Sequence, residues 1–541
     1  MNKKEGVELR TRALLDCTLR DGGYVNNWDF GRDQILEIFD RLVDAKIDYI
    51  EVGFLDEREA FNENRTIQPD TMSYNRLFAG ADKGNSIILA MIDYGTCGIE
   101  KLQPVQYSFL DGIRVIFKEH LRDEALAFCK KVKDLGYLVF AQMVSVTTYT
   151  DEALVEYAEA CNKIMPYATS MVDTYGLLDE EHLMHIFAIL DAHLAPEIRE
   201  GFHAHNNFQL GFANAKCFLN SESKRDLLAD GTLYGMGKSA GNAPLELLMM
   251  WCNEKFKTSY EISQALEAID NVLMDIYQKK YWGYSSFFFM ASSTACHPNY
   301  VNFFMSKKTL SMTQIHEILE KIQSNKKLLF DKEYAEACYL DYQLHECDDA
   351  VDFLKLSELL SDQKILLLGP GRNLKKQKAK VDAYIKCNNP IVIAVNYMPN
   401  DFEVNYLFVT KTKRYGELRR SWKIGNNCKA KIIATSNVVA MGHDFSYILN
   451  YGDYIDRDTE IIDNSFVMLL RFLQKLRVKD IIAAGFDGYS KRTDNYFDVR
   501  REYGFAKEKA DYLNRYVSAF LKQYSLNIHF ITNSKYHKIR R

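Results

Sequence analysis

Two histidines separated by one residue end a short apolar run, Gly201-Phe-His-Ala-His205. Side chains two positions apart in a strand point to the same face, so His203 and His205 can direct both imidazoles at one point. A second segment, Asp16-Cys-Thr-Leu-Arg-Asp-Gly22, places carboxylates and an arginine at the end of another apolar run. One carboxylate and two imidazoles with open coordination positions suit a divalent cation that also holds a substrate. Two structural histidines on a strand are the alternative.

The elements that must position these residues follow a repeating pattern from residue 12 to about 258. Short runs rich in β-branched and apolar residues alternate with amphipathic stretches such as Asp33–Asp44, each long enough for a crossover helix. The pattern predicts eight strands, at Ala13–Asp16, Tyr49–Phe54, Ile87–Ile92, Gly112–Phe117, Tyr137–Met143, Ala168–Asp173, Gly201–His205 and Leu228–Tyr234. Eight such repeats in this length predict a TIM (β/α)8 barrel.

Polar side chains stand at or just past the carboxyl end of every predicted strand, where the active site of a TIM barrel is built. In chain order they are Arg20 and Asp21, Glu51, Asp93, Lys118 with Glu119 and His120, Ser145, Asp173 with Thr174, His203 with His205, and the turn Gly235-Met-Gly-Lys-Ser-Ala-Gly-Asn242. Any one of them could simply cap an element, but their joint placement indicates a site.

Four of these segments together resemble one superfamily. They are Asp16–Gly22, Val172-Asp-Thr-Tyr-Gly176, His203-Ala-His-Asn-Asn207 with Gly211-Phe-Ala-Asn214, and the Gly235–Asn242 turn. Their order and spacing are similar to those of the DRE-TIM metallolyases, which include metal-dependent aldolases, HMG-CoA lyases and isopropylmalate synthases. The resemblance covers about residues 12–300. The His-Asn-Asn form and Gly283-Tyr-Ser-Ser-Phe287 are most similar to 4-hydroxy-2-oxovalerate-type aldolases.

The resemblance implies a ligand set and a cofactor. Asp21, His203 and His205 would hold a divalent metal, with Mn²⁺ or Mg²⁺ favoured because no cysteine cluster is present and the substrate offers hard oxygens. Asn242 matches a position that ligates metal in the lyase and synthase branches, so it is either a fourth ligand or a loop residue. Arg20 would steady the enolate oxygen that forms when a carbon–carbon bond beside a ketone breaks.

The predicted catalytic set contains one departure from the family. The oxovalerate-type aldolases carry a histidine base three positions after the aspartate ligand, and this chain has Tyr24 there. A tyrosine with an ordinary pKa near 10 is a poor base at neutral pH. His120, Tyr284, His297 and a metal-bound water are the replacement candidates. Tyr284 also matches a substrate-side tyrosine of these aldolases, and Thr174 completes the predicted set.

The chain's 541 residues are too many for one ordinary core, and three parts are expected. Residues 1–258 form the barrel, residues 259–355 a helical extension and linker, and residues 356–541 a Rossmann-like, doubly wound α/β domain. The third part opens with Lys364-Ile-Leu-Leu-Leu-Gly-Pro-Gly371, an apolar strand running into a glycine turn. Further strands are expected at Ile391–Val395, Leu407–Thr410, Ala430–Ala434, Ile481–Ala484 and Ile528–Ile531.

A nucleotide or a phosphorylated sugar is the expected ligand of the third part. The amides of the Leu368-Gly-Pro-Gly-Arg372 turn could meet a phosphate at a helix start. The turn lacks the full dinucleotide fingerprint. Gly485-Phe-Asp-Gly-Tyr489 faintly resembles sheet edges of sialyltransferase-like and nucleotide-sugar-handling domains. Asp487 there is either a ligand contact or a turn residue, and carbohydrate biosynthesis is the implied setting.

The sequence predicts a divalent-metal-dependent aldolase that joins or separates a pyruvate-like 2-oxoacid and an aldehyde. An acyl-CoA-dependent Claisen synthase or lyase on the same barrel and a non-catalytic binding or scaffold protein are the alternatives. A net charge of −5 without a basic block excludes nucleic acid as an implied partner. The eleven scattered cysteines form no Cys-x-x-Cys pair, and no apolar run is long enough to span a bilayer. A cytoplasmic homo-oligomer without membrane partners is therefore expected.

Overall fold

The computed structural model describes residues 11–307, 310–327, 329–344, 347–424, 430–438, 444–499, 502, 504–523 and 527–536. The chain forms two compact units, Met1–Pro298 and Asn299–Arg541. Their boundary falls inside the stretch 259–355 that was expected to be a helical extension. Across the described ranges, no helix is both long and apolar enough to cross a membrane.

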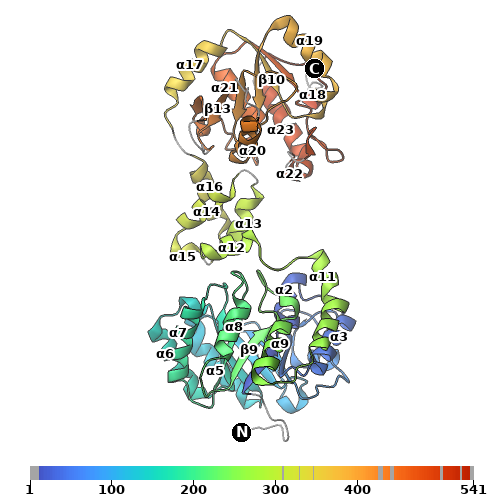
Figure 1. Cartoon of the computed structure of the whole chain (residues 1–541), viewed down its shortest axis with the longest axis vertical. Helices are drawn as coiled ribbons and strands as arrows, with labels where there is room; N and C mark the ends of the chain where they lie inside the picture. The colour runs from blue at the N-terminus through green and yellow to red at the C-terminus, as the bar shows by residue number, and fades with distance from the viewer. Residues whose placement is uncertain are drawn as a thin grey trace. The chain divides into compact units, whose positions relative to one another are not determined.

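The first unit contains a closed parallel barrel (Figure 1). Its strands are β1 (Arg12–Asp16), β2 (Tyr49–Leu55), β4 (Ile87–Asp93), β5 (Gly112–Phe117), β6 (Leu138–Val144), β7 (Ala168–Asp173), β8 (Arg199–Ala204) and β9 (Leu227–Gly231). The ring closes because β1 pairs with both β2 and β9. A short additional strand, β3 (Ile67–Gln68), pairs with β2 alone. The predicted eight-stranded TIM barrel is confirmed.

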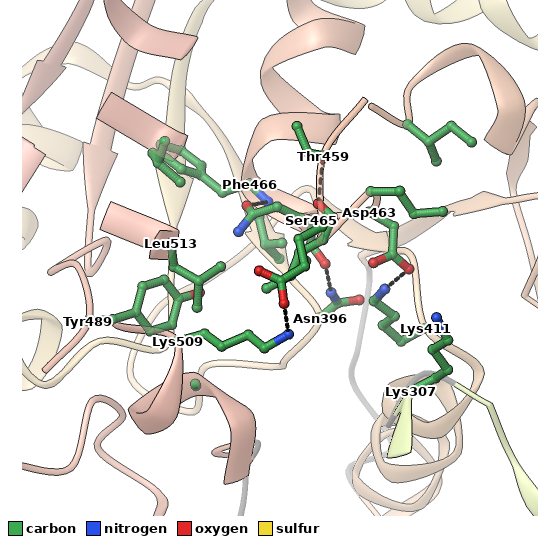
Figure 2. Close-up of a pocket in the computed structure, with 18 of the residues that line it drawn as sticks. Lys307, Asn396, Lys411, Thr459, Asp463, Ser465, Phe466, Tyr489, Lys509 and Leu513 are labelled. Carbon is green, nitrogen blue, oxygen red and sulfur yellow. Dashed lines mark hydrogen bonds and ion pairs between the residues drawn. The ribbon is translucent and has the colours of Figure 1, made fainter. Parts of the chain in front are cut away.

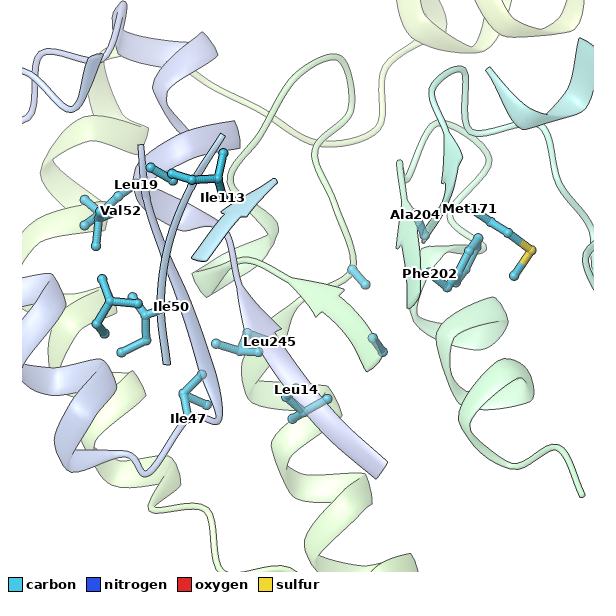
Figure 3. Close-up of a cluster of buried hydrophobic side chains, with 14 of the residues drawn as sticks. Leu14, Leu19, Ile47, Ile50, Val52, Ile113, Met171, Phe202, Ala204 and Leu245 are labelled. Carbon is cyan, nitrogen blue, oxygen red and sulfur yellow. The ribbon is translucent and has the colours of Figure 1, made fainter. Parts of the chain in front are cut away.

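Helices cover the outside of this ring. They are α3 (Arg32–Asp44), α4 (Thr71–Leu77), α5 (Arg122–Asp134), α6 (Asp151–Ile164), α7 (Glu180–His193), α8 (Gly211–Leu219), α9 (Leu245–Phe256) and α10 (Ile262–Ala268). Three of them begin at a side-chain cap, since Asp70 accepts a hydrogen bond from the Ser73 amide, Thr150 from the Ala153 amide and Asp179 from the His182 amide. The main core lies between helices and strands, where Leu14, Ile50 and Phe202 are buried (Figure 3).

Alternation along the strands decides which residues enter the barrel. In β8, Phe202 and Ala204 belong to the outer core, so His203 between them points inward. In β5, Ile113 and Val115 likewise face the helices, which leaves Arg114 inside. The barrel interior therefore receives charged side chains as well as the small apolar cluster that includes Leu15 and Tyr49.

The segment that follows α10 lies on the loops at the carboxyl ends of the strands. It contains α11 (Met274–Lys279) and α12 (Ser286–Ser293). The indole of Trp282 donates a hydrogen bond of 2.9 Å to the carbonyl of Tyr234, in the loop after β9. Asn207, just after β8, donates one of 2.9 Å to the hydroxyl of Ser292 in α12. This segment thus borders the site end of the barrel.

The second unit begins with helices, namely α13 (Pro298–Ser306, whose first residue ends the first unit), α14 (Met312–Lys321), α15 (Ser324–Lys327), α16 (Lys332–Gln343) and α17 (Ala350–Leu360). A parallel seven-stranded sheet follows, formed by β10 (Lys364–Leu368), β11 (Ile391–Val395), β12 (Tyr406–Val409), β13 (Lys431–Thr435), β14 (Tyr447–Leu449), β15 (Asp480–Ala484) and β16 (Ile528–Phe530). Its order is β14-β13-β12-β11-β10-β15-β16. This confirms the predicted parallel α/β sheet.

Helices cover both faces of that sheet (Figure 1). One face packs on α18 (Arg372–Lys376), α19 (Lys378–Asn388) and α20 (Thr412–Ile424), and the other on α17, α21 (Ser465–Lys475) and α23 (Ala510–Gln523). A short helix, α22 (Gly504–Glu508), precedes α23. Successive residues of a strand pack into opposite cores, as Leu367 and Leu368 of β10 show. Near-continuous apolar strands such as Ile391–Val395 follow from burial on both sides.

Candidate metal centre and catalytic site

Three predicted ligands meet at the carboxyl end of the barrel. His203 lies in β8, His205 follows that strand, and Asp21 ends the short helix α1 (Thr18–Asp21) after β1. One candidate ligand atom from each lies within 4.8 Å of the other two, and all three residues are buried. The two imidazole rings stand nearly perpendicular, with centroids 5.1 Å apart. The three side chains therefore converge on a single point, and for His203 and His205 this follows from the alternation of side chains along β8.

The donor atoms fit a cation. Nδ1 of His203 lies 3.0 Å from the Asp230 carboxylate, which fixes the ring and leaves Nε2 facing Asp21 at 3.6 Å. A carboxylate behind a ligating histidine is the usual support of a metal site. Nε2 of His203 and Nδ1 of His205 are buried and have no hydrogen-bond partner. Buried nitrogen atoms without partners cost free energy, and a bound cation would satisfy those that face it.

The charges of these groups also suit a metal ligand set. Burial acts to raise the pKa of Asp21, but the Arg20 guanidinium and His203 hold it well below its usual range. Burial lowers the pKa of His205 to about 3. Asp21 is therefore ionised and His205 neutral at physiological pH, and these are the forms that bind metal.

Asn242 is tied directly to the aspartate ligand. Its amide nitrogen donates a hydrogen bond of 3.0 Å to Oδ1 of Asp21, and the backbone amide of Lys238 donates to the same oxygen at 2.8 Å. The side-chain oxygen of Asn242 is buried without a partner. The glycine-rich turn thus positions Asp21, and we propose that Asn242 offers a fourth ligand atom.

The turn itself depends on Gly241. Its φ is +85°, and a Cβ there would lie 2.0 Å from the carbonyl oxygen of Gly235. Gly80 has nearly the same φ, +84°, but nothing lies within 4 Å of its Cβ position. We expect Gly80→Ala to cost about 1 kcal/mol of stability, from backbone strain alone. Gly241→Ala should cost at least about 2 kcal/mol more, because backbone must also move. Urea unfolding of both variants checks this, and equal losses would contradict it.

Behind the ligands lies a closed circuit of buried charged side chains, here called the charge ring. Arg20 contacts Asp21 and donates to Glu51 at 2.7 Å. Arg114 donates to Glu51 at 3.0 Å and to Asp230 at 2.5 Å. His203 contacts both Asp230 and Asp21, and these two contacts close the circuit. Its six members are Arg20, Asp21, Glu51, Arg114, Asp230 and His203.

Arg114 and Asp230 were not identified as site residues from the sequence. Both lie inside strands, whereas the predicted site residues lie at or just past strand ends. A signal was nevertheless present, because an arginine within Gly112–Phe117 and an aspartate within Leu227–Gly231 interrupt otherwise apolar runs. Since a buried charge must find a partner, two such interruptions of opposite sign indicate a pair inside the barrel.

A second group of candidate metal ligands consists of Cys17, His203 and Asp230. Burial raises the pKa of the Cys17 thiol well above its usual value, so the thiolate that binds metals is disfavoured. Asp230 is already paired with Arg114. Asp21, His203 and His205 are therefore the better ligand set.

Tyr24 borders the same site and is 42% exposed. Desolvation and the charge of Asp21 raise the pKa of its hydroxyl to about 12. The phenol therefore stays protonated at neutral pH, where it can donate a hydrogen bond. The ammonium of Lys238 lies 5.3 Å from the Tyr24 ring centre. Burial lowers the pKa of His297, and the charge of Lys238 lowers it further. Lys238 was part of the predicted glycine turn but was not singled out.

The other predicted catalytic residues lie around this site without direct contact to the ligands among the described interactions. The hydroxyl of Thr174, after β7, accepts a hydrogen bond of 2.8 Å from the Ser145 amide. Tyr284 is 58% exposed between the Trp282 anchor and α12. His120, a replacement candidate for the base, is exposed after β5. Their catalytic roles stay predictions.

Comparison with known proteins agrees with this geometry. Residues 12–272 match the model of the HMGL-like family. The predicted superfamily and the prediction of an enzyme are confirmed.

Curated relatives include an aldolase and a decarboxylase. The 4-hydroxy-2-oxovalerate aldolase of Chloroflexus aggregans is 27% identical over 253 residues, which cover 44% of this chain and 68% of that protein. The oxaloacetate decarboxylase of Mycobacterium tuberculosis is 27% identical over 241 residues, with coverages of 44% and 69%. The solved HMG-CoA lyase of Bacillus subtilis is 17% identical, covers 49% of this chain and 93% of that one, and gives a TM-score of 0.41.

Proposed function

We propose that the barrel is a divalent-metal-dependent aldolase that makes or breaks a carbon–carbon bond between a pyruvate-like 2-oxoacid and an aldehyde. The observation that carries the proposal is the convergence of Asp21, His203 and His205 on one point at the site end of the barrel. The aldolase relative supports the choice of reaction within the family.

The protein side chains supply distinct parts of this chemistry. A cation bound there would act as a Lewis acid for the enolate oxygen of the 2-oxoacid, and Mn²⁺ or Mg²⁺ suits the oxygen and imidazole donors. The guanidinium of Arg20 is held by Glu51 and Asp21, so it is already oriented before substrate binds. A fixed cationic donor stabilises charge that develops on the substrate without reorganisation.

Arg20→Lys tests that role. A lysine keeps the charge but cannot donate to Glu51 and Asp21 in the planar fork of a guanidinium. We expect metal-dependent exchange of deuterium from solvent into the pyruvate methyl group to slow by about 10² to 10³-fold. Arg32→Lys, at an exposed pair with Glu63, is the control and should leave the rate unchanged. A loss of less than about threefold at Arg20 would exclude this role.

The same exchange assay separates the candidate functions of the barrel. Metal-dependent exchange without acetyl-CoA supports the aldolase, whereas a requirement for acetyl-CoA supports the Claisen-type alternative. A protein that neither binds metal nor catalyses exchange would be the non-catalytic alternative. Release of carbon dioxide from oxaloacetate measures a second enzymatic candidate, which the decarboxylase relative favours and which passes through the same enolate.

For the second unit we propose a nucleotide or phosphorylated-sugar ligand, which could make the aldehyde sugar-derived. Its support is the parallel sheet, whose strand order reverses beside β10. Ligands of such sheets bind outside the carboxyl ends of the strands at the point of reversal. The expected homo-oligomer, cytoplasmic location and role in carbohydrate biosynthesis stay predictions.

A further inference from the structure

A large cavity lies within the second unit at the reversal point of its sheet. Strands β10 and β15 are neighbours there, and the loops that follow them, Gly369–Gly371 and Gly485–Tyr489, contribute to its wall. The cavity has a volume of about 870 Å³. This lies within the range of cavities that hold a cofactor-sized molecule. We call it the switch-point cavity.

The glycine turn after β10 does not offer its amides to a phosphate, contrary to the expectation from sequence. The amide of Gly371 donates to the carbonyl of Gly485 at 2.8 Å, and the amide of Asn373 donates to the Asp487 carboxylate at 2.8 Å. The start of α18 is thus already occupied by an anion of the protein. The glycines serve the close approach of the two loops, since a Cβ on Gly371 would lie 2.5 Å from the Gly485 oxygen.

Cations line a different part of the cavity. Lys411 follows β12 and is buried in an ion pair with Asp463, to which Tyr451 also donates. Arg414 is 5% exposed and pairs with Glu417 at 2.8 Å, and Lys307 pairs with Glu336 at 2.5 Å. The carboxylates of Glu417 and Glu336 are partly exposed. Water can solvate them if they are displaced, so a bound phosphate can replace them at low desolvation cost.

Aromatic and apolar side chains line the opposite part. Phe466 stacks on Phe486 with ring centroids 3.9 Å apart, and Tyr489 and Leu513 stand beside them. Figure 2 shows Tyr489 and Leu513 on one side of the pocket and Lys307 and Lys411 on the other. A ligand that fills the cavity therefore meets rings on the side of Tyr489, where Lys509 also lies paired with Glu460, and the cations Lys307 and Lys411 on the other side.

Asp487, which also lines the cavity, presents an unused acceptor. Its Oδ2 receives the Asn373 amide, while its Oδ1 is buried without a hydrogen-bond partner. A ligand hydroxyl would satisfy this oxygen. Among the described residues that line the cavity, six side chains are basic and five acidic, and the small net positive charge of this lining suits one or two phosphates better than three.

We propose that the switch-point cavity binds a nucleotide with one or two phosphates, its base against the Phe466 and Tyr489 side, its phosphates at Lys307, Lys411 and Arg414, and a sugar hydroxyl on Asp487. This rests on the proposed ligand class of the second unit and narrows it, because an aromatic wall suits the flat face of a base better than a plain sugar phosphate. The phosphates bind side-chain cations and not the glycine turn.

Isothermal titration calorimetry of the full chain tests the proposal. ADP, GDP, CDP and UDP are titrated separately, with pyrophosphate and glucose 1-phosphate as the comparison ligands. We expect at least one nucleotide to bind one to one and more tightly than pyrophosphate. Lys307→Met, which keeps the alkyl stem, should raise its dissociation constant by about tenfold or more, because a charged hydrogen bond is lost.

Lys378→Met is the matched control, since Lys378 pairs with Asp382 on α19, away from the cavity lining. The dissociation constant of the nucleotide for this variant should equal that for the unchanged protein.

Arg414→Met provides a second probe of the phosphate end. Binding unaffected by both Lys307→Met and Arg414→Met would overturn the location. If glucose 1-phosphate binds and no nucleotide does, the nucleotide inference fails and the broader proposal stands. If neither class binds, both fail. Equally tight binding of pyrophosphate would overturn the aromatic contact.

Discussion

His203→Ala should remove both the bound metal and the pyruvate exchange activity. The substitution deletes one of the three proposed ligands that converge within 4.8 Å, and Asp21 and His205 alone would leave a weak site. Metal content after dialysis against Mn²⁺, measured by elemental analysis, should fall from one ion per chain to background. Exchange should fall below detection, while the far-ultraviolet circular dichroism spectrum stays unchanged because the ligand does not support the outer core.

His185→Ala is the matched control for this prediction. His185 lies on the exposed surface of α7 and contacts Asp151. Its loss also removes an imidazole beside a carboxylate, but His185 is not one of the predicted ligands. Metal content and exchange should both be unchanged. A His203→Ala protein that keeps stoichiometric Mn²⁺ would contradict the ligand assignment, even if its activity were lost for another reason.

Arg114→Ala should destabilise the first unit by about 3 to 5 kcal/mol, the usual result of breaking a buried ion pair. Arg114 is completely buried and contacts Glu51 and Asp230. Its removal leaves two buried carboxylates without that cation. Urea unfolding followed by circular dichroism, fitted as separate transitions for the two units, measures the change.

Arg122→Ala isolates the effect of burial. Arg122 also contacts two acidic side chains, Asp123 and Glu156, but these are largely exposed. Exposed ion pairs contribute at most about 1 kcal/mol, so this variant should unfold at nearly the same urea concentration. Similar losses at Arg114 and Arg122 would show that the charge ring does not stabilise the barrel.

Most of the barrel could be predicted because its signals are local. The run Gly112–Phe117 is a strand with the predicted bounds, and its neighbours deviate by at most a few residues at their ends. The ligand cluster was also predictable, because alternation in β8 fixes the directions of His203 and His205 relative to each other. The position of Asp21 opposite them followed from parallel strands ending at one side of a barrel.

Other features depend on contacts between distant segments and leave little trace in the sequence. The short strand Tyr447–Leu449 was missed because it has too few residues for a recognisable period. The occupied helix start at Asn373 could not be foreseen, since its anion is Asp487, 114 residues away. The charge ring needed the register of four strands to bring Arg114 between Glu51 and Asp230.

The closed charge ring sets limits for engineering and laboratory evolution of this enzyme. Each member contacts two neighbours, so a single substitution leaves its partners unbalanced, and its effect depends on which other ring residues have changed. Tyr24, Lys238 and Tyr284 have exposed side chains at the site end of the barrel and are not members of the charge ring. Libraries that aim at a new aldehyde acceptor should therefore randomise these three positions and hold the six ring residues constant. Each of the three positions can be changed singly without leaving a buried charge unpaired.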